Sequence, residues 1–191
     1  MGLSACAHAQ AVLAEVCELT VPRVLGIDPG TVTMGFGVVE ELGDDGTALA
    51  WGVLTAPANM ALPQRLHTLY QQLQGTIARY QPTELAVEEP FTAKNPHSAL
   101  AVGQAQALAL LAAADHGLPV HAYTPAAVKQ AATNYGRSTK DQVREMVCLR
   151  LGLAPDLPEH AADALAIALC HIQERRLAAR LAEAQGTRVS P

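Results

Sequence analysis

The chain has 191 residues, of which 50% are hydrophobic, and its formal net charge at pH 7 is −5. This length suits one folded domain and leaves little room for a second hydrophobic core, and no apolar run approaches the roughly 20 residues of a membrane-spanning helix. The four cysteines form no CxxC pair and have no metal-ligand spacing, so they indicate neither a disulfide framework nor a zinc site.

The two ends of the chain differ from its middle. No Lys or Arg precedes Arg23, so the start of the chain lacks the basic region of a signal peptide. We interpret residues 1–22 as an N-terminal extension without fixed structure, residues 23–173 as the folded domain, and residues 174–191 as a C-terminal tail that frays. Together with the cysteine usage, this favours a cytoplasmic protein that does not associate with a membrane.

Three strands are predicted at the start of the domain. Arg23–Asp28 is a short apolar run that Pro29 and Gly30 stop, so the first strand ends at Asp28. Gly35–Val39 and Leu49–Leu54 flank an acidic segment that contains two glycines, which favours a hairpin.

The next elements alternate between helix and strand. Apolar positions recur every three or four residues from Leu62 to Ile77, which predicts an amphipathic helix. Glu84–Glu89 is predicted as a buried strand with two acids at its carboxyl end. Ser98–His116 is a helix rich in Ala and Leu on nearly all sides, so we expect it to be sandwiched or to form an interface. Leu118–Tyr123 is predicted as the fifth strand.

Three further helical segments are predicted in the rest of the domain. A short one runs from Pro125 to about Ala131, and a second begins at Ser138, which forms an approximate capping box with Asp141. The last runs from about Glu159 to Gln173. The order predicts an α/β domain with a mixed five-stranded sheet and helices on both faces, as in ribonuclease-H-like folds.

Acidic and metal-competent residues stand at the ends of these elements. Asp28 ends the first strand, Glu88 and Glu89 end the fourth, and His160 and Asp163 begin the last helix, three residues apart and on one face. Ligand sites gather at the carboxyl ends of strands in open α/β sheets, so we predict one common site.

Such a site suits phosphodiester hydrolysis. Carboxylate oxygens suit Mg²⁺, and two such ions about 3.5–4 Å apart can supply the attacking hydroxide and relieve charge on the leaving oxygen. Taken singly, each residue has a plainer interpretation: Asp28 before Pro-Gly forms turns, and His160 is a solvated or capping residue at a helix start. Only their convergence favours metal binding.

Four segments resemble successive motifs of the RuvC family of Holliday-junction resolvases, and the resemblance covers Arg23 to about His171. The segments are Gly26–Thr31 (GIDPGT), Val87–Asn95 (VEEPFTAKN), Gly103–Ala105 (GQA) and His160–Ala166 (HAADALA). The resemblance implies a homodimer that cuts four-way DNA junctions by paired nicks during recombination and repair. It also implies the RuvA and RuvB branch-migration proteins as partners.

The resemblance also implies the site residues. Asp28, Glu88, His160 and Asp163 match the catalytic set that binds metal, with Mg²⁺ or Mn²⁺ as cofactor and two ions per subunit. Glu88 rather than Glu89 matches the ligand position, because it directly follows the aliphatic Val87. The chain departs from many members at His160, where they have aspartate.

DNA-binding residues are predicted as well. In the family, an aromatic residue at the position of Phe91 is implicated in stacking on an unpaired base, although a core phenylalanine is an equal alternative. The predicted phosphate contacts are Lys94, Lys129, Arg137, Lys140 and Arg144. Of these, Lys129 and Lys140 match lysines of the family pattern, while a solvated surface is the ordinary interpretation of any single lysine.

Two other classes of function remain open. The segment Asp28–Thr31 also resembles the first phosphate loop of actin-like kinases, but such kinases need two duplicated halves and a second phosphate loop. The third class is a module that binds junctions without cutting them, or a nuclease of the same fold that acts on RNA. The intact acidic set argues against loss of activity.

Overall fold

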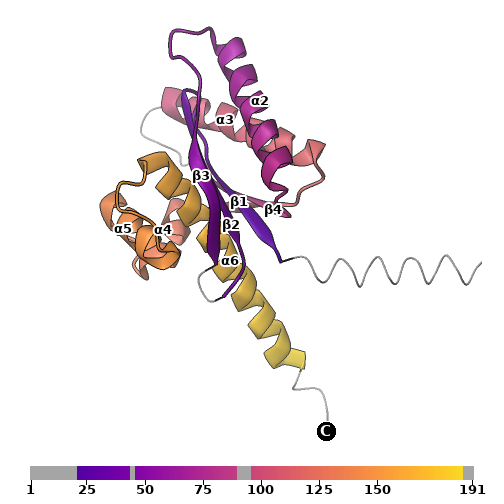
Figure 1. Ribbon diagram of the computed structural model, residues 1–191, viewed down its shortest axis with the longest axis vertical. Coiled ribbons are helices and arrows are strands. Elements are labelled where there is room, and N and C mark those ends of the chain that lie inside the picture. The colour runs from indigo at the N-terminus through magenta and orange to yellow at the C-terminus, as the bar shows by residue number, and fades with distance from the viewer. Residues whose placement is uncertain (1–20, 44–45, 90–95, 187–191) are drawn as a thin grey trace, which may run out of the picture.

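The computed structural model describes residues 21–43, 46–89 and 96–186 (Figure 1). The strands and helices of this part of the chain are β1 (Arg23–Asp28), β2 (Thr33–Glu40), β3 (Thr47–Thr55), α2 (Leu62–Tyr80), β4 (Glu84–Glu88), α3 (Pro96–Asp115), β5 (Val120–Tyr123), α4 (Pro125–Thr133), α5 (Lys140–Leu151) and α6 (Glu159–Gly186). None of the helices within these ranges is long and apolar enough to span a bilayer.

The strands form one mixed sheet in the order β3-β2-β1-β4-β5. The first three strands are antiparallel neighbours, whereas β4 runs parallel to β1 and β5 runs parallel to β4. The parallel pairs follow from the helical crossovers α2 and α3, which return the chain to the same end of the sheet. The predicted mixed five-stranded sheet is therefore confirmed.

Helices cover both faces of this sheet, as Figure 1 shows. Side chains alternate along each strand, so neighbouring residues enter different cores. Leu25 and Ile27 of β1 belong to the core under α2 and α3, whereas Val24 belongs to the core under α4, α5 and α6. Two hydrophobic cores of one domain thus share the sheet as their common wall.

Two glycines allow α6 to lie directly on the sheet. A Cβ atom at Gly26 of β1 would lie 2.0 Å from the carbonyl oxygen of Ala164, and one at Gly35 of β2 would lie 1.9 Å from that of His160. Both distances are far inside van der Waals contact, so no larger residue fits without moving the helix. This close packing holds the first turn of α6 beside the carboxyl end of β1.

The last helix is longer and more enclosed than the sequence pattern indicated. We expected it to end at Gln173, but α6 continues to Gly186. Residues past Gln173 are mostly Ala, Leu, Arg and Glu, which favour helix. In addition, Arg175 and Arg176 form ion pairs with Glu41, which directly follows β2. Helix propensity and these ion pairs together extend the helix beyond the predicted end.

Of the two alternatives predicted for the Ala- and Leu-rich helix, the described residues of the single chain show no sandwiching of α3, and a role in an interface stays a prediction. In α3 the alanines Ala105 and Ala109 are buried, but Leu100 is 63% exposed and Leu111 is 57% exposed. It is the first half of α6 that is enclosed, because the sheet lies on one side of it and α4 and α5 on the other. The alanine and leucine content of the two helices is similar, so composition alone could not separate them.

The start of α5 also differs from the predicted capping box. Thr139, not Ser138, caps the helix: its side chain accepts a hydrogen bond from the backbone of Gln142, whose own side chain accepts one from the backbone of Thr139. Ser138 is instead buried and lies 2.7 Å from the hydroxyl of Thr133. Ser138 and Thr139 both match the sequence pattern of an N-cap residue. Because α5 begins at Lys140, Thr139 is the residue at the N-cap position.

Candidate functional site

Two carboxylates lie side by side at one end of the sheet. In the parallel pair β1 and β4, Ile27 is the partner of Val87, so the next residues, Asp28 and Glu88, leave neighbouring strands at the same edge. Their side chains line one small hollow of about 100 Å³. Glu89, the alternative to Glu88, is exposed and does not line this hollow.

The first turn of α6 adds two more of the predicted residues. The Nδ1 atom of His160 lies 2.7 Å from Oδ2 of Asp28, and Asp163 lines the same hollow as Asp28 and Glu88. An ionised carboxylate only accepts hydrogen bonds, so Nδ1 of His160 donates to Asp28 and its Nε2 atom carries the lone pair. The structure therefore brings all four predicted catalytic residues to one place.

Lysines border this cluster. The Nζ atom of Lys140 lies 3.1 Å from Oδ2 of Asp163 and 2.7 Å from Oε1 of Glu159, and Lys129 lines the same hollow. The hydrogen bond from Lys140 to Glu159 raises the pKa of that ammonium above its ordinary value. Lys140 thus remains charged beside the acids.

The carboxylates destabilise each other's charged forms. Burial, followed by the charges of Asp28 and Asp163, raises the pKa of Glu88 to about 7. Burial also raises the pKa of Asp28 above its ordinary value, although the hydrogen bond from His160 works in the other direction. Partly buried acids that repel one another are typical of functional sites, where a cation relieves the repulsion.

The donor set fits divalent ions. Three carboxylates offer the hard oxygen ligands that Mg²⁺ and Mn²⁺ prefer, and the imidazole of His160 adds a nitrogen that Mn²⁺ accepts more readily than Mg²⁺. Burial and then the repulsion by Asp28 and Asp163 raise the pKa of Glu88 despite the opposing charges of Lys140 and Lys129, and this uncompensated repulsion among neighbouring acids favours a cation here.

The predicted DNA-binding residues are distributed unevenly. Phe91 and Lys94 lie outside the described residues. Lys129 and Lys140 line the hollow with the acids, whereas Arg137 is exposed in the turn between α4 and α5. Arg144 pairs with Asp141 at 2.9 Å. The residues that matched family lysines are therefore the ones that lie at the acidic cluster.

One neighbour of the cluster was missed from the sequence. Glu159 precedes His160 and holds the ammonium of Lys140 together with Asp163. Its spacing of four residues from Asp163 places both acids on the same side of the first turns of α6, and this was the signal available in the sequence.

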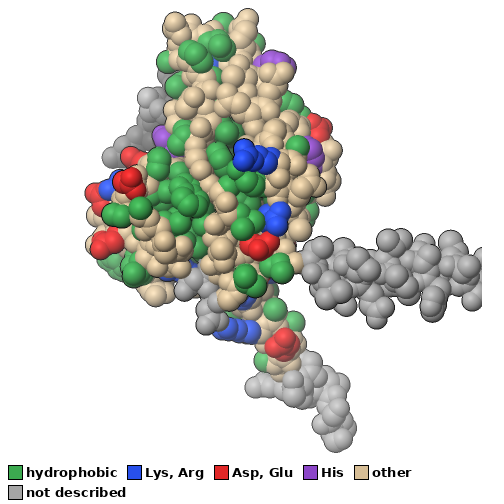
Figure 2. All heavy atoms as spheres, viewed as in Figure 1, with side chains coloured by type: hydrophobic (Ala, Val, Ile, Leu, Met, Phe, Trp, Pro, Cys, Tyr) green, Lys and Arg blue, Asp and Glu red, His purple; other side chains and the backbone are tan. Residues whose placement is uncertain are grey.

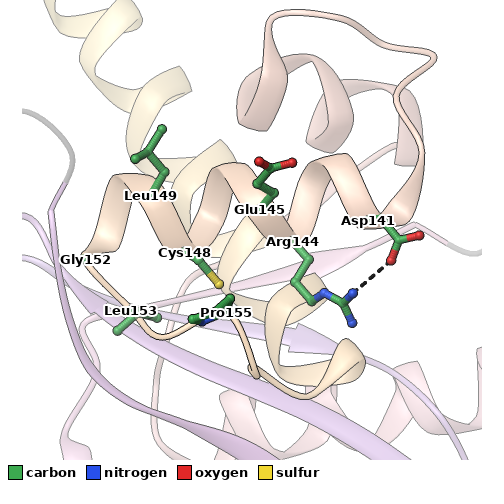
Figure 3. Close-up of a pocket in the computed structure, with 8 residues that line it drawn as sticks. All are labelled: Asp141, Arg144, Glu145, Cys148, Leu149, Gly152, Leu153 and Pro155. Atoms are coloured by element: carbon green, nitrogen blue, oxygen red, sulfur yellow. Dashed lines mark hydrogen bonds and ion pairs between the residues drawn. The ribbon is translucent and has the colours of Figure 1, made fainter.

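Cavity size does not identify the site. A wider hollow of about 540 Å³ lies along α5 and the segment after it, as Figure 3 shows. It is lined by Cys148, Leu149 and Leu153, with the ion pair of Asp141 and Arg144 at one end. None of the clustered acids reaches it. Its charged lining residues are Asp141, Arg144 and Glu145, and Asp141 is already paired with Arg144, so this hollow does not gather several acids as the cluster of Asp28, Glu88 and Asp163 does.

The distribution of Lys and Arg differs between the face shown in Figure 2 and the surroundings of the acidic cluster. On the face shown in Figure 2, hydrophobic and uncharged atoms predominate, and the Lys and Arg side chains are scattered. This face therefore offers no continuous basic stripe to a nucleic-acid backbone. The lysines at the acidic cluster are placed more favourably for that purpose.

Comparisons with known proteins agree on one family. Residues 24–171 match the family model of crossover junction endodeoxyribonuclease RuvC. A protein of that name from Dehalococcoides mccartyi is 51% identical over 154 residues, which is 80% of this chain and 92% of that protein. The one from Chloroflexus aggregans is 55% identical over 150 residues, covering 78% of this chain and 92% of its own.

A solved structure gives the same result. The structure of T. thermophilus RuvC in complex with Holliday junction substrate aligns with a TM-score of 0.77 and 36% sequence identity, covering 82% of this chain and 96% of that one. A yeast mitochondrial Holliday junction resolvase, at 18% identity and a TM-score of 0.59, shares the fold.

Proposed function

Because the chain belongs to the RuvC family of crossover junction endodeoxyribonucleases, we propose that it resolves four-way DNA junctions by paired, symmetric nicks, each made by two-metal-ion hydrolysis at Asp28, Glu88, His160 and Asp163. The observation that carries this proposal is the convergence of these four side chains, from three elements, at the end of the sheet. Membership of this family of endodeoxyribonucleases also argues against the alternative hypothesis of an actin-like kinase.

Each residue has a part in the proposed reaction. The three carboxylates and Nε2 of His160 would hold the divalent ions, and these ions would supply an attacking hydroxide and stabilise the leaving oxygen. His160 orients the carboxylate of Asp28 through its hydrogen bond from Nδ1. Lys140 carries its positive charge at the mouth of the cluster, 3.1 Å from Asp163, where it can bind the phosphate to be cut.

The proposal extends to the assembly. Symmetric incision of a four-armed junction calls for two sites related by a two-fold axis, so we propose a homodimer. The exposed leucines Leu100 and Leu111 on α3 offer an apolar surface for that contact. RuvA and RuvB are the proposed partners during branch migration, and the cytoplasm is the proposed compartment.

Cleavage of a synthetic four-way DNA junction tests the function directly. The substrates are the junction, a linear DNA duplex and an RNA–DNA hybrid, each incubated with Mg²⁺, with Mn²⁺ and with chelator. We expect symmetric nicks in the junction alone, and only with a divalent ion. Preferential cutting of the hybrid would favour the alternative of an RNA-directed nuclease, and binding without cutting would favour a recognition module.

The variant Asp28→Asn provides the matched control for that assay. The change removes the charge of a proposed metal ligand at nearly constant shape, so cleavage should fall by at least about 100-fold. Folding and junction binding should persist, because the lost charge also relieves repulsion with Glu88. Cleavage at the normal rate would contradict the assignment of this residue.

A further inference from the structure

A second cluster of ligand-type side chains lies at the other end of β4, away from the acidic cluster. It consists of Glu84 at the start of β4, His121 on β5 and His171 on α6, whose ligand atoms all lie within 4.8 Å of one another. Glu84 and Glu88 are the two ends of one five-residue strand, and four steps of an extended chain separate them by about 13 Å. The two clusters are therefore independent sites.

The geometry directs both imidazoles at one carboxylate oxygen. Oε2 of Glu84 lies 2.6 Å from Nε2 of His171 and 3.2 Å from Nε2 of His121. The two rings are stacked with centroids 4.3 Å apart, so both Nε2 atoms are presented to the same point. Tetrahedral zinc places neighbouring ligand atoms about 3.3 Å apart. The pair of His121 and Glu84 already has this separation, the contact of His171 with Glu84 would have to open by less than about 1 Å, and the ligand atoms of the two histidines lie within 4.8 Å of each other.

Surrounding groups hold the three side chains in place. The hydroxyl of Tyr123 lies 2.6 Å from Nδ1 of His171, and Arg175 donates to the other carboxylate oxygen, Oε1, of Glu84 at 2.8 Å. Metal-binding histidines are usually oriented by such a contact of the second ring nitrogen. The carboxylate of Glu84 only accepts hydrogen bonds, so without a metal Nε2 of His171 donates to it and Nδ1 accepts from the hydroxyl of Tyr123. When a metal binds at Nε2, the ring takes its other tautomer, in which Nδ1 donates to the oxygen of Tyr123.

The protonation of these groups suits the same role. Burial lowers the pKa of His171, which favours the neutral imidazole that binds metal, and burial raises the pKa of Tyr123 to about 12, so its hydroxyl stays neutral. His171 is only 3% exposed, whereas the side chain of His121 is 41% exposed. An ion can therefore enter beside His121 and meet a preformed pair inside.

We propose that Glu84, His121 and His171 form a binding site for a divalent transition metal of the zinc class, separate from the catalytic site. Two histidines and one glutamate are a set that holds zinc with a fourth position open to water. Zn²⁺ binds imidazole more tightly than Mn²⁺ does, and Mg²⁺ prefers an all-oxygen octahedron. The ion joins β4, β5 and α6, so it stabilises the fold. The site contains no cysteine, so cysteine spacing gave no sign of it.

Calorimetric titration of the full chain with Zn²⁺, in buffer with excess Mg²⁺ to occupy the acidic cluster, tests the proposal. The variant His121→Gln alters a half-exposed side chain, and His67→Gln, on the exposed side of α2, is its matched control. We expect one Zn²⁺ equivalent per chain to be lost or weakened at least 10-fold in His121→Gln alone. Zinc held elsewhere, for instance by the acidic cluster of Asp28, Glu88 and Asp163, would be equal in all three proteins.

Two further measurements keep the result unambiguous. Zn²⁺ should raise the thermal midpoint of the original protein and of His67→Gln, but not that of His121→Gln. Tyr123→Phe, which removes only the hydroxyl that orients His171, should weaken Zn²⁺ binding about 10-fold. Equal stoichiometry, affinity and thermal shift in His121→Gln and the original protein would overturn the proposal. Junction cleavage should be unchanged in His121→Gln, because the two sites are separate.

Discussion

Glu88 couples the stability of the metal-free protein to pH. Burial and the charges of Asp28 and Asp163 raise the pKa of its carboxyl from 4.5 to about 7. Since the pKa is higher in the folded than in the unfolded protein, the folded state binds this proton more tightly. The corresponding stability is fully present below about pH 4.5 and is lost as the pH rises through about 7.

We therefore expect the thermal midpoint in chelator to fall between about pH 5 and about pH 8, relative to the variant Glu88→Gln. The contribution is on the order of 1–3 kcal/mol, which amounts to several degrees for a domain of this size. Mg²⁺ or Mn²⁺ should restore the lost stability at high pH. Scanning calorimetry across this range provides the measurement, and parallel curves for the two proteins would contradict it.

We expect His160 to influence which ion the proposed metal site prefers. Its imidazole is bonded through Nδ1 to Asp28, so Nε2 can coordinate an ion only while it is unprotonated. A neutral nitrogen in place of a carboxylate lowers the negative charge of the ligand set and favours Mn²⁺ over Mg²⁺. Mn²⁺ should therefore support cleavage at a lower concentration than Mg²⁺ does.

Two variants separate this role from that of a helix-end residue. His160→Asp should raise the activity with Mg²⁺ relative to Mn²⁺ by several-fold. His160→Ala should impair cleavage with either ion. Metal titrations of cleavage rate give the result. Identical titrations for all three proteins would leave the metal site to Asp28, Glu88 and Asp163.

At the scale of elements, the approach of α6 to the sheet assembles the site. A Cβ atom at Gly35 would lie 1.9 Å from the carbonyl oxygen of His160, so Gly35→Ala must displace the first turn of α6. We expect a loss of at least about 1–3 kcal/mol in unfolding free energy, together with a lower cleavage rate.

Gly75→Ala is the matched control for that change. Gly75 lies in α2 with open space around its position, so the added methyl group should stabilise the protein by about 0.5–1 kcal/mol and leave cleavage unchanged. Denaturant unfolding and junction cleavage of both variants give the comparison. If Gly35→Ala behaved like Gly75→Ala, the packing of α6 on β2 would not control the site.

The sequence predicted the positions of the helices and strands better than it predicted their burial and tertiary contacts. Strong local signals, such as the apolar run that ends at Asp28 and the leucine period of α2, located β1 and α2, and the confirmed mixed five-stranded sheet was predicted from the order of the elements. The burial of α6 and the ionic contacts of Lys140 with residues of α6 depend on partners far along the chain. Single-sequence periodicity contains no information about such partners.

The two clusters of candidate ligands also differ in how far local sequence signals could predict them. Each acid was detectable because it ends a strand or begins a helix, and the parallel register of β1 and β4 then brings Asp28 beside Glu88. The cluster of Glu84, His121 and His171 gave no such signal, because its residues lie at the opposite ends of strands and deep within a helix. Only the packing of α6 across the sheet brings them together.

At the scale of the whole molecule, the net charge of −5 opposes binding of a polyanion. Part of that charge is concentrated at Asp28, Glu88 and Asp163, where divalent ions would reverse its sign. Lys129 and Lys140 line the same hollow, so the groups that can attract phosphate surround the groups that would hold the ions. We therefore expect the local arrangement of charged side chains to affect DNA binding more than the net charge of the protein does.

The salt dependence of junction binding tests this arrangement. Each phosphate contact that a cation makes releases counterions from DNA, so its loss should lower the slope of log affinity against log salt by about 0.9. We expect this decrease for Lys129→Ala and for Lys140→Ala in chelator. Lys140→Ala should also weaken binding more than Lys129→Ala does at every salt concentration, since it leaves the charges of Asp163 and Glu159 facing the phosphates without compensation.

Arg79→Ala, which removes an exposed cation from α2, is the control for net charge alone. Fluorescence anisotropy of a labelled junction across a salt series supplies the slopes, and slopes for both lysine variants equal to that of Arg79→Ala would mean that Lys129 and Lys140 are merely solvated.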